Sequence, residues 1–174
     1  MKHQNEYRDP ELARLQLEAI QNTVNGFDRT MTLMEVCGTH TMSAFRSGLH
    51  DLLPANVSLL SGPGCPVCVT AQGDIDQLLG LAETPGVTLF SYGDMLRVPG
   101  SDCDLLQIKA RGGEVRIVYS PLDAVEIARK NPDREVVVFA VGFETTAPAN
   151  SMAVWRARQL GVTNISVLVS HVTV

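Results

Sequence analysis

Side chains capable of metal binding or redox chemistry lie in two short stretches of the sequence. Cys37 and His40 lie three residues apart in MEVCGTHTMSAF, and Cys65 and Cys68 lie three residues apart in SGPGCPVC. Two cysteines at this spacing can close a disulfide reversibly, and thiolates and imidazoles are ligands for zinc and iron. The residue types therefore indicate either thiol redox chemistry or a metal site.

Spacing alone leaves three functions open. Cys37 and His40 together with Cys65 and Cys68 have the ligand types of a structural zinc site, although the gap between the pairs is longer than in most zinc fingers. The Cys65–Cys68 pair could instead serve a metal-free thiol–disulfide oxidoreductase. In the third arrangement, Cys37 and the pair hold a soft metal such as iron and leave positions open for non-protein ligands.

The remaining candidates have simpler explanations. We expect Cys103 to be a small buried residue, because it has no Cys or His partner nearby in the sequence. Thr39 and Thr41 are placed where threonines commonly cap a helix, and residues 144–146 (Glu-Thr-Thr) have the composition of a helix start. His171, at the end of a predicted strand, is a weak candidate for a site.

Composition excludes several classes of protein. The chain has 174 residues, of which 45% are hydrophobic and 19% are charged, so it is not an extended disordered chain. Its net charge of −5 gives no electrostatic reason to bind nucleic acid or an anionic membrane. The N-terminus resembles no secretory signal, and the longest apolar run, Val136–Val141, is too short to cross a bilayer. We therefore expect a cytoplasmic protein, in which cysteines favour metal or redox roles over disulfides.

The hydrophobic pattern predicts alternating strands and helices after an N-terminal helix. Asp9-Pro10-Glu11 provides an N-cap, a helix-starting proline and an acidic first turn, and the helix should end near Asn25-Gly26. Strands are expected at 30–36, 57–60, 87–90, 115–119, 136–141 and 165–169, and helices at 42–53, 74–83, 102–111, 122–130 and 147–160. This order predicts an α/β fold of βαβ units, with a parallel sheet covered by helices on both faces.

Three loops of interest follow the carboxyl ends of predicted strands. Cys37 and His40 follow the first strand, residues 62–68 follow the second, and residues 142–146 (GFETT) follow the strand that ends at residue 141. Ligand sites in open α/β sheets lie beyond the carboxyl ends of the strands. We therefore expect the sulfur atoms of the first two loops to share one mouth, with GFETT facing them across a cleft.

Several of these motifs together resemble the hydrogenase maturation factor HypD family. The matching stretches are CGTHT, GPGCPVC, YSPLDAVEIA and GFETTAPA, and the resemblance runs from about residue 10 to the last residue. The family is about twice as long, with two similar α/β domains and a four-iron four-sulfur cluster whose cysteines have no counterpart here. The resemblance implies an N-terminal helical extension at 1–29, a first α/β domain at 30–133 and a truncated second domain at 134–174.

The resemblance also implies a function and site residues. With a HypC-type chaperone, the family serves as the scaffold on which the iron of nickel–iron hydrogenase acquires cyanide and carbon monoxide, the cyanide coming from HypE with HypF. Cys37 would be the principal iron thiolate, and Cys65 and Cys68 would be a redox pair also associated with iron. His40 and the threonines at 39 and 41 would shape the iron pocket, and Glu144, Thr145 and Thr146 would line the cleft. Such a chain is a redox-active maturation factor rather than a stand-alone turnover enzyme.

Overall fold

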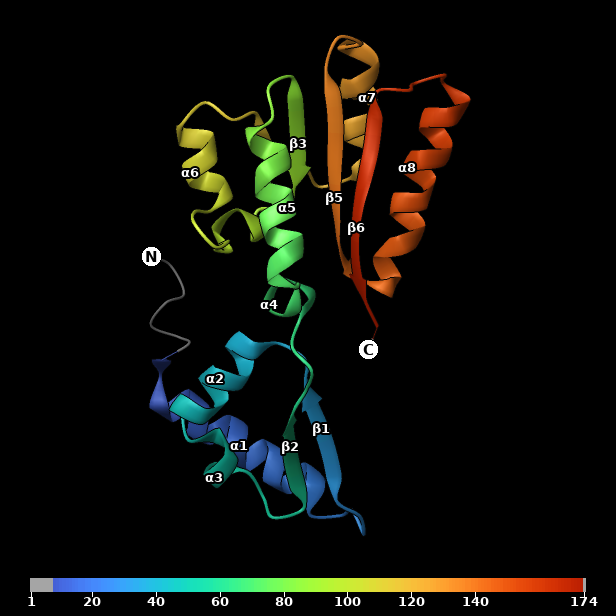
Figure 1. Ribbon diagram of the computed structural model, residues 1–174. Coiled ribbons are helices and arrows are strands. Elements are labelled where there is room, and N and C mark those ends of the chain that lie inside the picture. The colour runs from blue at the N-terminus through green and yellow to red at the C-terminus, as the bar shows by residue number, and fades with distance from the viewer. Residues whose placement is uncertain (1–7, 174) are drawn as a thin grey trace. The chain divides into compact units, whose positions relative to one another are not determined.

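The computed structural model describes residues 8–173, which form parallel sheets and helices (Figure 1). The α/β class with parallel strands is as predicted. The chain divides into two compact units between Gly64 and Cys65, and the strands form two sheets, one in each unit. The predicted domain boundaries, after residues 29 and 133, lie elsewhere, and the second of them separates strands that belong to one sheet.

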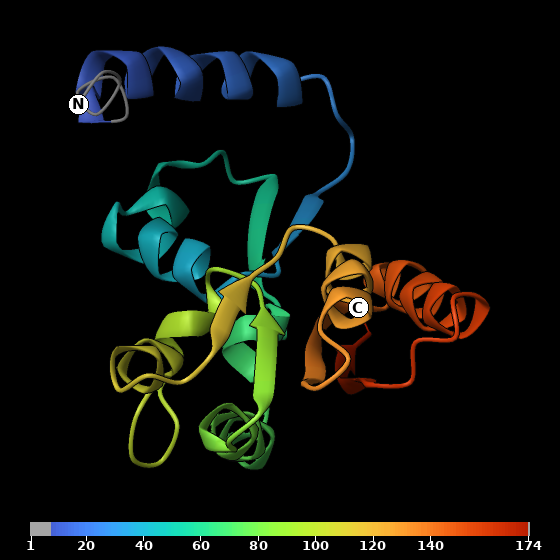
Figure 2. The same cartoon turned by 90° about the horizontal axis from the view of Figure 1, so that it is seen from above.

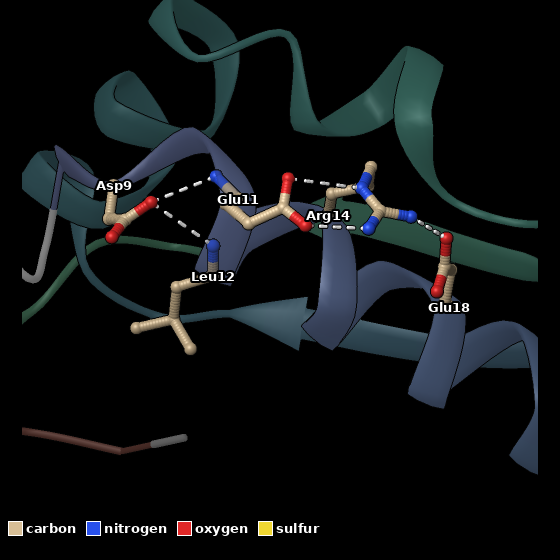
Figure 3. A network of polar contacts seen from close by, with 5 residues as sticks. All are labelled: Asp9, Glu11, Leu12, Arg14 and Glu18. Carbon is tan, nitrogen blue, oxygen red and sulfur yellow. Dashed lines mark hydrogen bonds and ion pairs between the residues drawn. The ribbon is translucent and has the colours of Figure 1, made fainter.

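The first helix, α1 (Pro10–Val24), begins as its sequence predicts. The Asp9 carboxylate accepts hydrogen bonds from the main-chain N–H groups of Glu11 (2.9 Å) and Leu12 (3.3 Å), as Figure 3 shows. On the next turn, Arg14 forms ion pairs with Glu11 and Glu18. These charges are exposed, so the cap rather than the ion pairs fixes the start of the helix.

The first unit continues with β1 (Met31–Glu35), α2 (Gly38–Arg46), α3 (Leu49–Leu52) and β2 (Val57–Ser61). The single helix predicted at 42–53 is wrong, because Gly48 adopts a left-handed conformation (φ 68°) that ends one helix and begins the next. The two strands are parallel, with Met31 opposite Val57 and Glu35 opposite Ser61.

The second unit holds the remaining elements. They are α4 (Pro66–Val69), α5 (Gln72–Glu83), β3 (Val87–Ser91), η2 (Met95–Arg97), α6 (Leu105–Ala110), β4 (Val115–Ile117), α7 (Pro121–Lys130), β5 (Glu135–Phe143), η3 (Glu144–Thr146), α8 (Ala147–Gln159) and β6 (Ile165–Val172). Every long element was predicted, with ends displaced by a few residues. The short α4, η2 and η3 were not.

The four strands of the second unit are all parallel, in the order β4-β3-β5-β6. Connections leave β3 toward one side of the sheet and β5 toward the other, so the carboxyl ends of β3 and β5 form a topological switch point. The strands differ in length. Pairing of β5 with β3 runs to Val138 opposite Phe90, whereas β5 continues to Phe143, opposite Val172 of β6.

Helices cover both faces of this sheet. Figure 2 shows α5 and α6 on one side and α7 and α8 on the other. On the first side Leu78 and Leu105 pack against Leu89 and Phe139, and on the second Ala124 and Ala128 pack against Val138. These side chains are almost fully buried, so the second unit has a core of its own. No helix within residues 8–173 combines the length and the apolar character that a membrane crossing needs.

Candidate thiol and cavity sites

Cys37 lies in the first unit, in the turn between β1 and α2. It is the N-cap residue of α2, in an extended conformation, and is half-buried. Its main-chain N–H donates to Oε1 of Glu35 at 3.2 Å. The same oxygen lies 3.2 Å from Nδ1 of His40, one turn into the helix. The Glu35 carboxylate therefore fixes both the main chain at Cys37 and the imidazole of His40.

Thr39 and Thr41 lie in the first turn of α2. The expectation that they cap this helix is wrong, because Cys37 occupies the N-cap position and no side chain accepts a hydrogen bond there. A cap needs extended backbone ahead of the helix, and both threonines are already inside it. Both threonines therefore lie on the same turn as His40, and the main-chain N–H of Thr41 donates to the Cys37 carbonyl oxygen at 3.0 Å.

The second loop starts directly against the end of β1. The N–H of Gly62 donates to the carbonyl oxygen of Glu35 at 2.8 Å. A Cβ atom at Gly62 would lie 2.7 Å from that oxygen and 3.2 Å from Cα of Val36. Only glycine permits this approach of two backbones. Within the first unit, the CGTHT turn and the start of GPGCPVC are therefore neighbours.

Cys65 and Cys68 lie in the second unit, on the short helix α4. Cys65 is its N-cap residue, and the N–H groups of Cys68 and Val69 donate to the Cys65 carbonyl oxygen at 2.9 and 3.1 Å. This turn brings the two Sγ atoms to 3.3 Å, with the Cys65 thiol donating to Cys68. A disulfide needs about 2.05 Å, so a small side-chain rotation would bring the two sulfur atoms to bonding distance, and an oxidant that takes two electrons would then close the bond.

A cavity of about 620 Å³ opens at the carboxyl ends of the strands in the second unit. It lies at the topological switch point, where ligands bind in sheets of this kind. Its lining residues are Cys65, Pro66, Val67, Tyr92, Asp94, Tyr119, Pro121, Val141, Gly142, Phe143, Thr145, Thr146 and Ala149. Of the predicted site residues, Cys65, Thr145 and Thr146 therefore come together on its wall. Glu144 is exposed and does not line it.

Two tyrosines of this cavity were not predicted as site residues from the sequence. Tyr92 follows β3 and is half-buried, and burial raises the pKa of its hydroxyl above the ordinary value. Tyr119 is 95% exposed at the entrance. Neither tyrosine belongs to a pattern of spacing that indicates a site. Tyr92 lies two residues after the predicted strand 87–90, and Tyr119 is the last residue of the predicted strand 115–119 and the first of the YSPLDAVEIA stretch.

Asn150 holds the end of the GFETT segment by a hydrogen bond. It is buried, and its Nδ2 atom donates to the Thr146 carbonyl oxygen and to Nε2 of His171, both at 3.1 Å. The Thr146 hydroxyl in turn donates to the carbonyl oxygen of Phe143 at 2.8 Å. Asn150 thus joins the start of α8 to the end of β6 and fixes Thr146. His171 therefore contacts the segment that lines the cavity only indirectly, through its hydrogen bond with Asn150.

The predicted metal ligands are divided between the two units. Cys37 and His40 belong to the first, and Cys65 and Cys68 to the second. Within the part of the chain that the structure describes, no three His, Cys, Asp or Glu side chains gather as a group that could hold a metal ion. The shared mouth for the three sulfur atoms stays a prediction. Cys103 is half-buried against the core of the second unit, in a loop before α6 rather than within a helix.

Comparison with known proteins identifies the family. The sequence profile described as "HypD: Hydrogenase formation hypA family" matches residues 11–174. The chain belongs to the HypD family. It is 50% identical over 173 residues to the hydrogenase maturation factor HypD of Azotobacter vinelandii, 45% identical over 178 residues to that of Rhodobacter capsulatus, and 44% identical over 177 residues to that of Escherichia coli K12.

These HypD relatives are much longer than the chain. The matches cover 99–100% of the chain but only 45%, 47% and 48% of the three relatives. The chain therefore spans about half the length of the curated HypD proteins it matches. Its membership supports a role in hydrogenase maturation.

Proposed function

We propose that the chain carries thiol groups of the platform on which the iron–cyanide–carbonyl centre of nickel–iron hydrogenase is assembled. Iron is the cargo of this platform. In the proposal Cys37 supplies the principal iron thiolate, and Cys65 and Cys68 act as a redox pair that also associates with iron. The observation that carries the proposal is the 3.3 Å separation of the paired sulfur atoms, beside a cavity at the switch point.

The dithiol suits the chemistry of ligand attachment. Closing one disulfide oxidises Cys65 and Cys68 and releases two electrons and two protons. In the proposal the two electrons pass to the donor group that carries cyanide and break its bond to cyanide. The donor atom leaves reduced and takes up one proton, the second proton goes to solvent, and cyanide goes to the iron. Thiolates favour soft metal centres and leave room for such non-protein ligands. The cavity wall at Cys65 would admit the incoming group.

The neighbouring side chains have positioning roles in this proposal. Glu35 orients His40, and the hydroxyl groups of Thr39 and Thr41 lie on the same turn as that imidazole. Thr145 and Thr146 line the cavity, while Glu144, which is exposed, would act at its rim. These residues would shape the surroundings of the iron fragment and of its ligand donor.

Partners and electron supply belong to the proposal as well. A HypC-type chaperone would hold the iron jointly with Cys37, and HypE, charged with the help of HypF, would deliver cyanide. The four-iron four-sulfur cluster that returns electrons to the Cys65–Cys68 pair would be held by the part of the family's length that this chain does not cover.

Anaerobic co-expression of a full-length HypD-family protein that carries the present chain as its matched part, together with the HypC- and HypE-type partners, followed by iron analysis and infrared spectroscopy, tests this proposal. The protein should bind iron and show cyanide and carbonyl stretching bands. Cys37→Ser and Cys65→Ser should lose both signals, whereas Cys103→Ser is the matched control and should keep them. Iron-free chain, or a Cys37→Ser variant with undiminished iron and bands, would contradict the proposal. Recovery of one zinc per chain, with unfolding on chelation, would indicate a structural zinc domain instead.

A metal-free thiol–disulfide oxidoreductase is the second candidate, and the contact between the Cys65 and Cys68 sulfur atoms favours it too. The two candidate functions differ in whether they need the Cys37 thiol. An oxidoreductase should keep its thiol-exchange activity in Cys37→Ser and lose it in Cys65→Ser. The iron platform needs Cys37.

A further inference from the structure

The β1–β2 pair of the first unit has apolar side chains on both faces. Leu33 and Met34 are neighbours on β1, so they point to opposite sides of the sheet, and they are 49% and 57% exposed. Leu60, opposite Met34 on β2, is 45% exposed. Consecutive apolar residues, rather than alternating ones, are typical of parallel strands covered on both sides.

The first unit does not supply that cover itself. Val24 is the only hydrophobic side chain that is fully buried among residues 8–64. Helices α2 and α3 add further exposed apolar side chains, Phe45 at 58% and Leu52 at 57%. Two strands are too few for an independently stable sheet. The first unit therefore lacks the layer that would bury its apolar surface.

The outer edges of this pair are also open. Within residues 8–173, neither β1 nor β2 has a second strand beside it. Edge strands that must stay single usually carry lysine, proline or a bulge, and β2 (VSLLS) has neither lysine nor proline. The unpaired backbone groups and the apolar side chains of the β1–β2 pair thus resemble those of strands inside a larger parallel sheet.

We propose that the β1–β2 pair is the acceptor for the part of a HypD-family chain that the present match leaves uncovered. More than half of each compared relative lies outside the match, which is enough chain for several βαβ units. Those units would add parallel strands to an edge of the pair and lay helices over Leu33, Met34 and Leu60. This inference rests on family membership and burial and is independent of the iron chemistry.

Such docking has a direct consequence for the candidate site. Cys37 and Gly62 follow the carboxyl ends of β1 and β2. Strands added in parallel would place their own carboxyl ends, and the loops that follow them, along the same edge. The added segment would therefore complete the surroundings of the CGTHT turn.

Hydrogen–deuterium exchange of the chain, alone and mixed with the separately produced uncovered part of the Azotobacter vinelandii HypD, tests the proposal. The mixture should form a one-to-one complex, and amides in β1 and β2 should exchange roughly tenfold more slowly or better. The exchange rates of amides in β3 should not change, because helices already cover both faces of its sheet. Light scattering gives the stoichiometry.

A matched pair of substitutions sharpens the result. Leu33→Asp should abolish the complex, whereas Leu106→Asp on α6 of the second unit, at a similar 40% exposure, should leave it intact. Both side chains are exposed, so both variants should keep the circular dichroism of the parent chain. If the separately produced half is insoluble, the test uses the full-length Azotobacter vinelandii HypD instead. Aspartate at its position aligned with Leu33 should speed amide hydrogen exchange in its two strands that align with β1 and β2.

Several outcomes would overturn the proposal. One is slowed exchange at β6, the open edge of the second sheet, in place of β1 and β2. Another is strong protection of β1 and β2 in the chain alone, whether as monomer or as dimer of two copies. Absence of a complex from two soluble halves, or unchanged exchange in the full-length aspartate variant, would overturn it too.

Discussion

Asn150 donates a hydrogen bond to Nε2 of His171 at 3.1 Å, and the same amide nitrogen donates to the carbonyl oxygen of Thr146. One buried side chain thereby joins the end of β6 to the first turn of α8. Asn150→Ala should lower the free energy of unfolding by about 1–3 kcal/mol, because it leaves two partly buried acceptors without a donor. Denaturant titration measures this, with the exposed Ser151→Ala as control.

A double-mutant cycle isolates the bond between these two residues. Combining Asn150→Ala with His171→Ala should give a coupling energy of about 0.5–1.5 kcal/mol. Additive effects of the two substitutions would show that the contact contributes nothing to stability.

The paired sulfur atoms predict selective oxidation. A mild thiol oxidant should convert Cys65 and Cys68 into one intramolecular disulfide, because their Sγ atoms are already 3.3 Å apart. Thiol titration and peptide mass mapping measure the product. Cys103→Ser should oxidise like the parent, and Cys65→Ser should form no such bond. A disulfide that instead joins Cys103 would contradict the arrangement on α4.

Adjacent leucines on α6 test the core of the second unit. Leu105 is 1% exposed and packs in the core, whereas Leu106 is 40% exposed. Leu105→Ala should cost about 2–5 kcal/mol of unfolding free energy, and Leu106→Ala about 0.5 kcal/mol or less. The pair controls for helix propensity, since both changes occur in one helix. Equal losses in chemical denaturation would refute the assigned burial.

Gly62 provides a test of the close approach behind Cys37. Gly62→Ala would force a Cβ atom to within 2.7 Å of the Glu35 carbonyl oxygen, so it should destabilise the first unit by about 1–3 kcal/mol. Gly26→Ala is the control, because its Cβ atom would meet nothing within 4 Å. Exchange rates of amides in β1 report the effect. Similar rates in both variants would mean that the two backbones lie farther apart.

The Asp76 carboxylate makes stability depend on pH. Its pKa lies below the ordinary 3.8 because the N–H of Ser101, then the Ser101 hydroxyl, then Gln72 donate hydrogen bonds to it. A lowered folded-state pKa stabilises the fold above the unfolded pKa, and this contribution is lost as the pH falls through the folded value.

Asp76→Asn should therefore reduce the melting temperature at neutral pH, and the difference from the parent should shrink in acid. Thermal melts from acidic to neutral pH measure the difference in melting temperature, with Asp102→Asn, at an exposed residue, as control. A difference that grows in acid would contradict the hydrogen bonds assigned to Asp76.

Local sequence signals predicted the elements well but not how they group. Asp9 and Pro10 fixed the start of α1, and β-branched runs marked β3, β5 and β6. Of these strands, β3 and β5 are buried on both faces. The division after Gly64 was not predictable. β1 and β2 have the same apolar character as the strands of the other sheet, so nothing in their residues assigns them to a separate one.

The candidate site was predictable where chemistry is local. Cys65 and Cys68 meet because one turn of helix brings them together, which their spacing implies. Asn150 and Tyr92 could not be found in this way. Their roles come from contacts across strands that are distant in sequence, and asparagine and tyrosine have many other uses. The helix predicted through Gly48 failed because a hydrophobic period continues across a residue that needs a positive φ.

The overhang of β5 beyond its neighbour β3 makes a ledge at the rim of the second sheet. Val141, Gly142 and Phe143 sit on this ledge, past the last residue that pairs with β3. Part of the cavity lining therefore comes from strand that extends beyond the pairing with β3. Val141 also packs in the core, and a side chain at Gly142 would clash with Thr146, so both positions are constrained. Phe143 is half-buried and lies outside the core clusters, so a different side chain there could change what the cavity accommodates while the core stays intact.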